Sequence, residues 1–457
     1  MDLYKAIEEE KKEYEKKYPE SKRIFEESLQ YLPAGVSSTA RMVKSGWDPF
    51  PLSVEKGTGS HVVDVDGHDF IDYLLGLGPN ILGHRHPVIT EAVTKHINEV
   101  GTVFALASSL DATAARKMVE TVDSLDKVRL VNSGTEAVIY ALRLARTFTG
   151  KHKVVRFEGM YHGFSDSIYW SKHPSKAAID ENGNCKPEPQ GPGLPVGLEE
   201  NLIICQWNDL DALTEIIENN KDEIAAVITE PIMCNTGCIL PKPGYLEGIR
   251  KLTEDNGIIM IMDEVITGFR VALGSAQGYY GIKPDLSVFA KGMGGGYPVA
   301  ALGGRADIMK LIDDGIVSVA GTYSGNGIAL SAVSATIDYL SEPGRYEEFT
   351  EKSLRLMNGL DKLFRESKLD AYVEGVGPLF QVWFSKEKIY NYRDAEKYAS
   401  EEMFTLWWHE MLDRGILFHP HYYENMFISM AHSDEDIDRT LEAAEQSIRS
   451  MENKLGL

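Results

Sequence analysis

Cysteine and long apolar segments are both scarce in this sequence. Four cysteines occur in 457 residues, and no two of them are spaced as Cys-x-x-Cys. A disulfide framework and a thiolate zinc site are therefore disfavoured, and a reducing compartment is favoured. No apolar run reaches the roughly 20 residues that cross a membrane, and the charged N-terminus has no apolar signal core. We expect a cytoplasmic protein without a membrane segment.

Basic residues are also few. The chain has 47 Lys and Arg against 69 Asp and Glu, which gives a net charge of -22. That excess repels nucleic-acid phosphates and anionic lipid, and no local basic patch offsets it. Small molecules are therefore the expected partners, and nucleic acid is not. His84 and His86 lack nearby carboxylate or thiolate partners, so we predict no metal site.

The apolar pattern that is present predicts a two-lobed α/β protein. Short apolar runs alternate with helical periodicity in the middle of the chain, which is typical of a mostly parallel, doubly wound sheet. These runs are Val128–Val131, Val154–Phe157, Ala225–Ile228, Ile258–Met262 and Leu286–Phe289. Pro51–Tyr73 alternates around turn signals, as an antiparallel meander does. We predict a small α+β domain built from residues 1–85 and 331–457, and a large domain from residues 86–330.

A long loop interrupts this pattern. His173–Gly197 is rich in Pro, Gly, Lys and Asn and has little periodicity, which is typical of a surface loop. Loops of this length often gate active sites. We expect this one to lie on the surface beside the functional site.

A possible phosphate anchor lies where the first run of the sheet ends. In Asn132-Ser133-Gly134-Thr135-Glu136, Ser133 and Glu136 are spaced as a capping box, which predicts a helix running to about Gly150. The first turn of a helix offers free N–H groups and the positive end of its dipole, and the hydroxyls of Ser133 and Thr135 add donors for a phosphate. Alone, this motif is equally explained as an ordinary helix cap.

Two further motifs carry an acid and a lysine. Asp263 follows the buried run ending at Met262, so its carboxylate is expected at the carboxyl edge of the sheet, where α/β folds bind ligands. There it can pair with a cationic ring nitrogen, although a salt bridge or helix cap explains it as well. Lys291 follows Leu286–Ala290 and precedes a glycine-rich turn. A lysine in that setting is desolvated, which lowers its pKa as a Schiff-base nucleophile requires.

Together the three motifs are more specific than any one of them. The chain carries the phosphate, acid and lysine motifs in that order, together with four longer sequence segments. In these features it resembles the class III, fold-type I aminotransferases that use pyridoxal phosphate, and it looks most like the glutamate-1-semialdehyde 2,1-aminomutase group. The segments are Asn132–Ala137, Phe157–Gly163, Asp263–Arg270 and Gly321–Asn326, and the resemblance extends from about Phe25 to Met451.

The resemblance implies a role for each motif residue. Lys291 holds the cofactor as a Schiff base, and Asp263 keeps its ring nitrogen protonated. The phosphate binds at Ser133, Gly134 and Thr135. The remaining cofactor contacts that it implies are Tyr161 on one ring face with His162 beside it, Val265 on the other face, and Glu230 and Asn235 at the polar edge. Thr322 reaches the phosphate of the neighbouring subunit, so a homodimer with shared active sites is implied.

The residues expected to recognise the substrate match the family only in part. Arg41 matches the position at which the aminomutase group has an arginine for the substrate carboxylate, which suits a guanidinium, and Glu424 matches an acidic position that would orient it. Two features depart from the group: Leu77 stands where the family has a tryptophan, and the loop His173–Gly197 is longer than the gating loop. These departures favour a transaminase that moves an amino group from an amino acid or ω-/β-amino acid to a keto acid or aldehyde. The alternatives are an aminomutase, a racemase or epimerase on the same scaffold, and a noncatalytic protein that only binds the cofactor.

Overall fold

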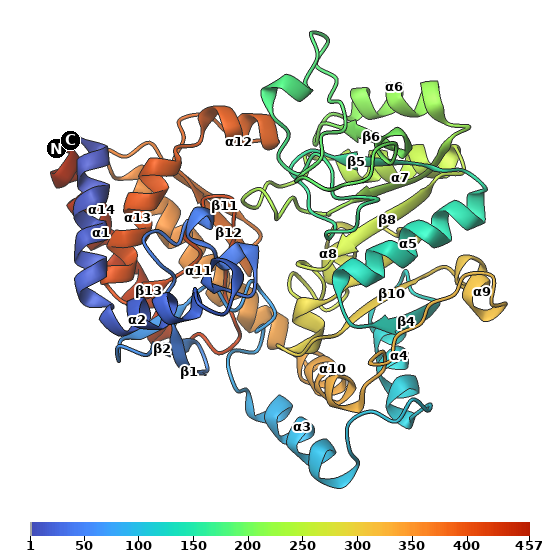
Figure 1. Ribbon diagram of the computed structural model, residues 1–457, viewed down its shortest axis with the longest axis horizontal. Coiled ribbons are helices and arrows are strands. Elements are labelled where there is room, and N and C mark those ends of the chain that lie inside the picture. Colours follow the sequence, from blue (N-terminus) through green and yellow to red (C-terminus); the bar gives the residue numbers. More distant parts are fainter. Residues whose placement is uncertain (1) are drawn as a thin grey trace.

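The chain forms two lobes that lie side by side in Figure 1. A computed structural model describes residues 2–457. The α-helices are α1 (Leu3–Lys17), α2 (Pro19–Ser28), α3 (Pro87–Glu99), α4 (Ser109–Thr121), α5 (Gly134–Thr149), α6 (Leu210–Asn220), α7 (Tyr245–Asp255), α8 (Ser275–Tyr280), α9 (Ala306–Asp313), α10 (Gly327–Leu340), α11 (Arg345–Arg365), α12 (Tyr392–Tyr398), α13 (Glu401–Asp413) and α14 (Asp434–Leu455). The strands are β1 (Val54–Thr58), β2 (His61–Asp64), β3 (Asp69–Asp72), β4 (Lys127–Val131), β5 (Lys153–Phe157), β6 (Leu202–Cys205), β7 (Ile224–Thr229), β8 (Ile259–Glu264), β9 (Leu286–Phe289), β10 (Ala300–Gly304), β11 (Tyr372–Gly375), β12 (Leu379–Trp383), β13 (Ile416–Leu417) and β14 (Met426–Phe427).

The large lobe is built on one sheet with the strand order β4-β10-β9-β8-β7-β5-β6. The neighbours from β9 to β6 are all parallel, and β10 runs antiparallel to both of its neighbours. Every residue of the central strands β7, β8 and β9 is buried, because helices cover both faces of a parallel sheet. The prediction of a mostly parallel sheet is therefore confirmed, and the five apolar runs lie in β4, β5, β7, β8 and β9.

The small lobe joins the two ends of the chain. Its first sheet has the order β1-β2-β3-β13: the expected antiparallel meander is present, and β13 adds to it in parallel from the C-terminal part. The marked N- and C-termini lie next to each other in Figure 1. The domain boundaries at residues 85 and 330 stay predictions.

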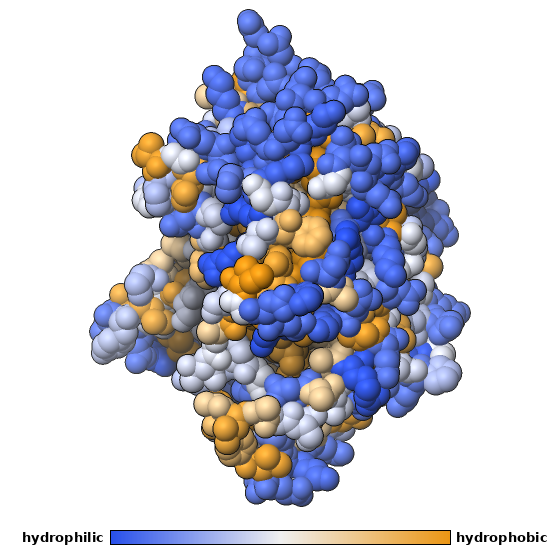
Figure 2. All heavy atoms as spheres, turned by 90° about the vertical axis from the view of Figure 1, so that its right-hand side faces the viewer, coloured by the Kyte–Doolittle hydropathy of each residue, from blue (hydrophilic) through white to orange (hydrophobic). Residues whose placement is uncertain are grey.

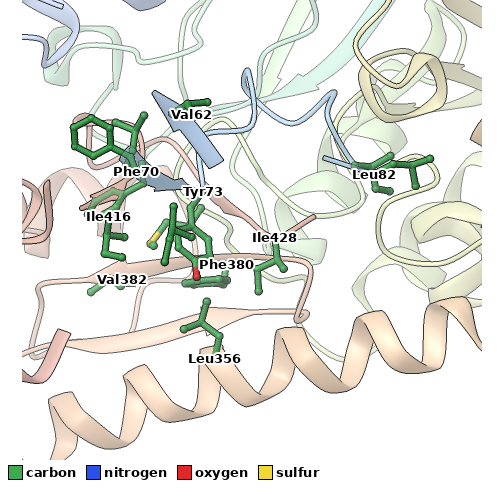
Figure 3. Packing of buried hydrophobic residues seen from close by; sticks show 14 of the residues in the cluster. Val62, Phe70, Tyr73, Leu82, Leu356, Phe380, Val382, Ile416 and Ile428 are labelled. Atoms are coloured by element: carbon green, nitrogen blue, oxygen red, sulfur yellow. The ribbon is translucent and has the colours of Figure 1, made fainter. Parts of the chain in front are cut away.

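A shared apolar core holds these two ends together. Figure 3 shows Phe70 of β3 and Ile416 of β13 close to Phe380 and Val382 of β12, with Leu356 of α11 below them. Each of these side chains is at most 1% exposed. Burying a side chain of this size contributes about 1.5–3 kcal/mol. The N-terminal meander therefore depends on the C-terminal helices for its core.

Arg270 links the two lobes. Its guanidinium is fully buried and donates to the carbonyls of Gly78 (2.5 Å) and Ile428 (2.9 Å). It also lies 5.0 Å from the ring centre of Phe427, a favourable cation–π distance. Since Arg270 follows β8 while its partners belong to the small lobe, the contact holds the small lobe against the carboxyl edge of the large sheet.

Polar and apolar side chains are unevenly distributed over the surface (Figure 2). Figure 2 shows that hydrophilic residues dominate one face, with smaller apolar groups, one of them near its lower end. Among the helices of residues 2–457, none has the length and apolar character needed to cross a membrane. Most of the loop 173–197 is irregular, as expected, with one short 3₁₀ turn at Lys176–Ala178.

Candidate active site

A pocket lies at the carboxyl ends of β7, β8 and β9, the edge at which parallel α/β sheets bind ligands. Its lining consists of Tyr161, Glu230, Ile232, Cys234, Asn235, Asp263, Val265, Ile266, Thr267 and Lys291. Six residues singled out from the sequence therefore meet here: Tyr161, Glu230, Asn235, Asp263, Val265 and Lys291. They come from the ends of four strands, which only the sheet order brings together.

Lys291 enters the pocket from a strained turn. It begins a 3₁₀ turn directly after β9 with a left-handed φ of 46°, a conformation that costs about 1–3 kcal/mol in a residue with a side chain and is often found at functional sites. Burial lowers the pKa of its amine, against the opposing charges of Glu424, Glu230 and Asp263. Among residues 2–457 it forms no ion pair. A lowered amine pKa favours the unprotonated, nucleophilic form.

Asp263 is buried beside a neutral histidine. Its Oδ2 lies 2.8 Å from His162 Nδ1, and its Oδ1 accepts the N–H of Val265 at 3.1 Å. Burial lowers the pKa of His162, so the imidazole is neutral at pH 7 and donates its Nδ1 hydrogen to the carboxylate. No cation neutralises Asp263 within the described chain, which leaves its negative charge for a ligand.

Glu230 organises the polar side of the pocket. Its carboxylate accepts the N–H of Tyr161 at 2.9 Å, the N–H of Cys234 at 2.6 Å and the side-chain amide of Asn235 at 2.7 Å. Burial raises the pKa of Glu230 to about 7. The three donors hold Tyr161 and Asn235 in place, so Glu230 positions its neighbours.

The N-terminus of α5 closes one end of the site. A Cβ on Gly134 would lie 2.9 Å from Val265 Cγ2, and a Cβ on Gly163 would lie 2.6 Å from Thr135 Oγ1. These positions therefore require glycine, and they bring the helix start against Val265 and the Tyr161 segment. The amides of Gly134 and Thr135 make no hydrogen bond among the described residues. They remain available for an anion, as the first amides of a helix do.

The expected capping box is only half formed. Ser133 is the N-cap and accepts the N–H of Glu136 at 3.2 Å. The carboxylate of Glu136 instead accepts the N–H of Asn132 at 2.8 Å. The expectation of a reciprocal bond to Ser133 was therefore wrong, because the carboxylate bonds to the backbone and side-chain amides of Asn132 instead. The Ser133 amide is left unused by Glu136.

Other predicted residues lie outside this pocket. Thr322 is exposed, in a segment that contacts the start of α5 through Ser324 and Asn132 (3.5 Å). Arg41 is exposed in a short 3₁₀ turn, and no hydrogen bond or ion pair joins it to Glu424 in the described chain. Glu424 lies near enough to Lys291 for its charge to raise the pKa of that amine. The roles assigned to these residues stay predictions.

Sequence reasoning missed a group of residues beside Glu424. His173 Nε2 lies 3.3 Å from the carbonyl of Asn235, and its ring stands 4.9 Å from that of Tyr423. His421 stands 5.5 Å from Tyr423. The spacing of His419 and His421 just before Glu424 was the available signal, but the loop that carries His173 approaches only in the folded chain.

Comparisons with known proteins agree with this geometry. The model of the aminotransferase class-III family matches residues 42–448. A glutamate-1-semialdehyde 2,1-aminomutase of Brevibacillus brevis is 41% identical over 431 residues, covering 94% of this chain and 98% of the relative. The crystal structure of an omega-transaminase from Sphaerobacter thermophilus has a TM-score of 0.88 at 28% identity, covering 94% and 97%. A structure described as a transaminase with PLP bound has a TM-score of 0.86 at 25% identity, covering 96% and 99%. The predicted enzyme class and cofactor are thereby confirmed: this chain belongs to the aminotransferase class-III family and is an enzyme that depends on pyridoxal phosphate.

Proposed function

We propose that the protein transfers an amino group between an amino acid or ω-/β-amino acid and a keto acid or aldehyde, with Lys291 as the residue that binds the cofactor. The observation that carries this proposal is the convergence of Lys291 and Asp263 in one pocket. A lysine with a lowered amine pKa and a carboxylate without a cationic partner are the two groups that the cofactor's aldehyde and ring nitrogen require.

The other groups around the pocket fit the same cofactor. The free amides of Gly134 and Thr135, with the hydroxyls of Ser133 and Thr135, suit its phosphate. Tyr161 with His162 on one side and Val265 on the other suit a flat ring. Glu230 and Asn235 suit the ring's polar edge. When bound, pyridoxal phosphate supplies an electron sink for negative charge on the substrate carbon next to the amine.

The chain's own residues then have distinct tasks. Asp263 holds a proton on the ring nitrogen, and His162 holds Asp263 by its Nδ1 hydrogen. Lys291, once its amine is free, moves a proton from the substrate carbon, since it lines the pocket and burial lowers the pKa of its amine toward the range of a general base. Asp263 and Lys291 are therefore the proposed catalytic residues.

A homodimer completes the proposal. Large apolar side chains are exposed after α3 and at Tyr323, with 57% of Val100, 55% of Phe104, 81% of Leu106 and 64% of Tyr323 open to solvent. These two segments are neighbours, because Gly327 donates to the carbonyl of Thr102 at 3.3 Å. Exposed apolar patches of this kind mark interaction surfaces. A second copy seated here would bring its Thr322 to the phosphate end of the pocket.

The experiment is to mix the purified protein with a panel of amino donors and follow the cofactor's absorbance. Conversion from the pyridoxal to the pyridoxamine form, with release of a keto product, is expected. A racemase would invert the donor without releasing keto product. A protein that only binds the cofactor would show no amine-dependent change in absorbance. Either result would refute the transaminase proposal.

The second candidate is glutamate-1-semialdehyde 2,1-aminomutase activity. The 41% identity to a protein of that name over 431 residues favours it. Leu77 in place of the family's tryptophan, and the long loop 173–197, favour the transaminase, since an aminomutase must retain its intermediate until the second transfer. Incubation with glutamate 1-semialdehyde separates the two: 5-aminolevulinate formed without a second substrate identifies the aminomutase.

A further inference from the structure

Lys172 places a positive charge beside Tyr161 of the pocket lining, and none of the roles above uses it. It lies directly before the loop 173–197, and its carbonyl accepts the N–H of Gly159 at 2.7 Å. Its ammonium lies 5.4 Å from the ring centre of Tyr161, and Tyr161 lines the pocket together with Lys291. The side chain is partly buried. Lys172 is therefore a cation next to the proposed reaction centre.

This ammonium has no anionic partner. Among residues 2–457 its side chain forms no ion pair and no hydrogen bond, and the face of Tyr161 is its recorded contact. A cation–π contact of this kind only partly offsets the water that a partly buried ammonium loses. By contrast, Lys176, four residues later on the same loop, is exposed and pairs with Glu396. Lys172 has the donor capacity to bind an anion that enters the pocket.

Neutral imidazoles surround the Lys172 charge. Burial lowers the pKa of His173, His419 and His421, and the charge of Lys172 lowers each of them further. For His421 the pKa falls to about 4. These three side chains are therefore uncharged at pH 7. Lys172 supplies the positive charge of this group. The N–H groups of His173 and His419 already donate to the carbonyls of Asn235 and Ala40, so of the three imidazoles only His421 can offer a neutral donor.

Glu424 is a negative charge near the same group of side chains. Its negative charge raises the pKa of His419, His421 and Lys291, so it lies near all three. Lys172 influences the same two histidines with the opposite sign. Charges of opposite sign therefore lie near the same two histidines, and the negative one is also near Lys291. A single ammonium matches a single carboxylate, whereas a phosphate dianion needs more donors.

We propose that Lys172 is a specificity-determining residue that binds a carboxylate of the substrate at the mouth of the Lys291 pocket. This inference rests on the proposed amino-transfer function and names its substrate class, amino compounds that carry a carboxylate. The sequence had suggested Arg41, which is exposed, as the residue that binds the substrate carboxylate. The inference gives that contact to Lys172, which is partly buried.

The test compares two carbonyl reagents that differ by one carboxylate, aminooxyacetate and methoxyamine. Both capture the cofactor's aldehyde and change its absorbance, and neither requires amino transfer. We expect the wild-type holoenzyme to react faster with aminooxyacetate. K172M should slow that reaction by about 10-fold or more, equivalent to about 1.4 kcal/mol, and leave methoxyamine within about twofold. K172R should retain the preference, and K176M is the matched control from the same loop.

Three results would overturn the inference. They are a wild-type enzyme that does not prefer aminooxyacetate, a K172M variant that keeps the wild-type ratio, and a K172M variant that slows both reagents equally, which would mean that Lys172 only supports Tyr161. Failure of the proposed function looks different. In that case the carbonyl reagents still react with the expected ratio, but no amino donor converts the cofactor to its pyridoxamine form.

Discussion

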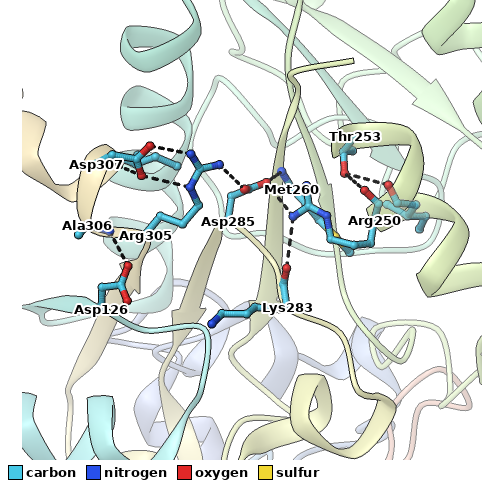
Figure 4. A network of polar contacts seen from close by, with 11 residues as sticks. Asp126, Arg250, Thr253, Met260, Lys283, Asp285, Arg305, Ala306 and Asp307 are labelled. Atoms are coloured by element: carbon cyan, nitrogen blue, oxygen red, sulfur yellow. Dashed lines mark hydrogen bonds and ion pairs between the residues drawn. The ribbon is translucent and has the colours of Figure 1, made fainter. Parts of the chain in front are cut away.

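The two ends of strand β9 both carry buried charges, but the charges are satisfied in opposite ways. At the start, Asp285 accepts from Arg305 at 2.7 Å, from Arg250 at 2.9 Å and from the N–H of Met260 at 2.8 Å, as Figure 4 shows. At the other end, Lys291 forms no ion pair in the described chain. Asp263, beside it, is bonded only to neutral donors.

This difference separates structural charge from reactive charge. Buried ions are costly unless they are paired, so a fully paired group such as Asp285 serves the fold. Groups that form no close ion pair in a buried pocket leave the empty site less stable, and a ligand that pairs with them stabilises it. Substitutions at the two ends of β9 should therefore change different properties, the reaction rate at one end and the free energy of unfolding at the other.

Removing the lysine should affect only chemistry. K291A is expected to lower the rate of amino transfer by roughly 10³-fold or more, because the cofactor loses its covalent anchor and the reaction loses its base. Single-turnover absorbance with an active donor measures this rate. Lys283, which is exposed near the other end of β9, provides the control K283A, which should keep full activity. A K291A protein with normal turnover would contradict the assignment.

Removing the paired acid should affect only the fold. D285A removes the carboxylate that accepts from the guanidinium of Arg250 and the N–H of Met260; the Lys283 carbonyl remains as an acceptor for Arg250. We expect the free energy of unfolding to fall by about 3 kcal/mol, the lower end of the range for a broken buried pair, since Arg305 is 43% exposed. Urea unfolding gives this value, and the amino-transfer rate at low temperature should stay within about threefold. A large loss of rate in a stable D285A protein would remove the contrast between the two ends of β9.

Changing Asp263, the acid without a Lys or Arg partner in the described chain, should affect the reaction rate more than the free energy of unfolding. D263N keeps an acceptor for His162 and Val265 but removes the negative charge. Loss of a charge partner costs about 3–4 kcal/mol in the transition state, so the half-reaction should slow roughly 10²–10³-fold, with a smaller effect on unfolding than D285A. If D263N and D285N changed the half-reaction rate and the free energy of unfolding by equal amounts, the distinction between reactive and structural charge would be wrong.

The smallest effect concerns Glu264, next to Asp263 but turned into the fold. Burial raises its pKa from 4.5 to about 7, so between these values the folded protein binds a proton that the unfolded chain has released. Stability should therefore fall as pH rises through this window. E264Q should flatten that slope by up to about 1.4 kcal/mol per pH unit. Urea unfolding of both proteins between pH 5 and 8 measures the slope, and identical slopes would exclude Glu264 as its cause.

Much of the site was predictable because its residues follow local patterns. Asp263 ends a buried run and Lys291 follows another, and apolar runs of this length already identify strands. Ser133 was recognisable as a helix start from its neighbours alone. The reciprocal bond from Glu136 was not formed, since spacing does not determine which of the neighbouring amides the carboxylate reaches, and here it reaches those of Asn132.

By itself, the sequence determined the strands, the helix starts and the order of the phosphate, acid and lysine motifs, because each depends on residues that are near one another in the chain. Only the tertiary structure decided that His162 would hold Asp263 and that Lys172, His173 and Glu424 would each lie near a residue of the pocket lining. Those contacts join segments up to hundreds of residues apart, and which of them meet is set by the strand order of the sheet and the packing of the small lobe against its edge.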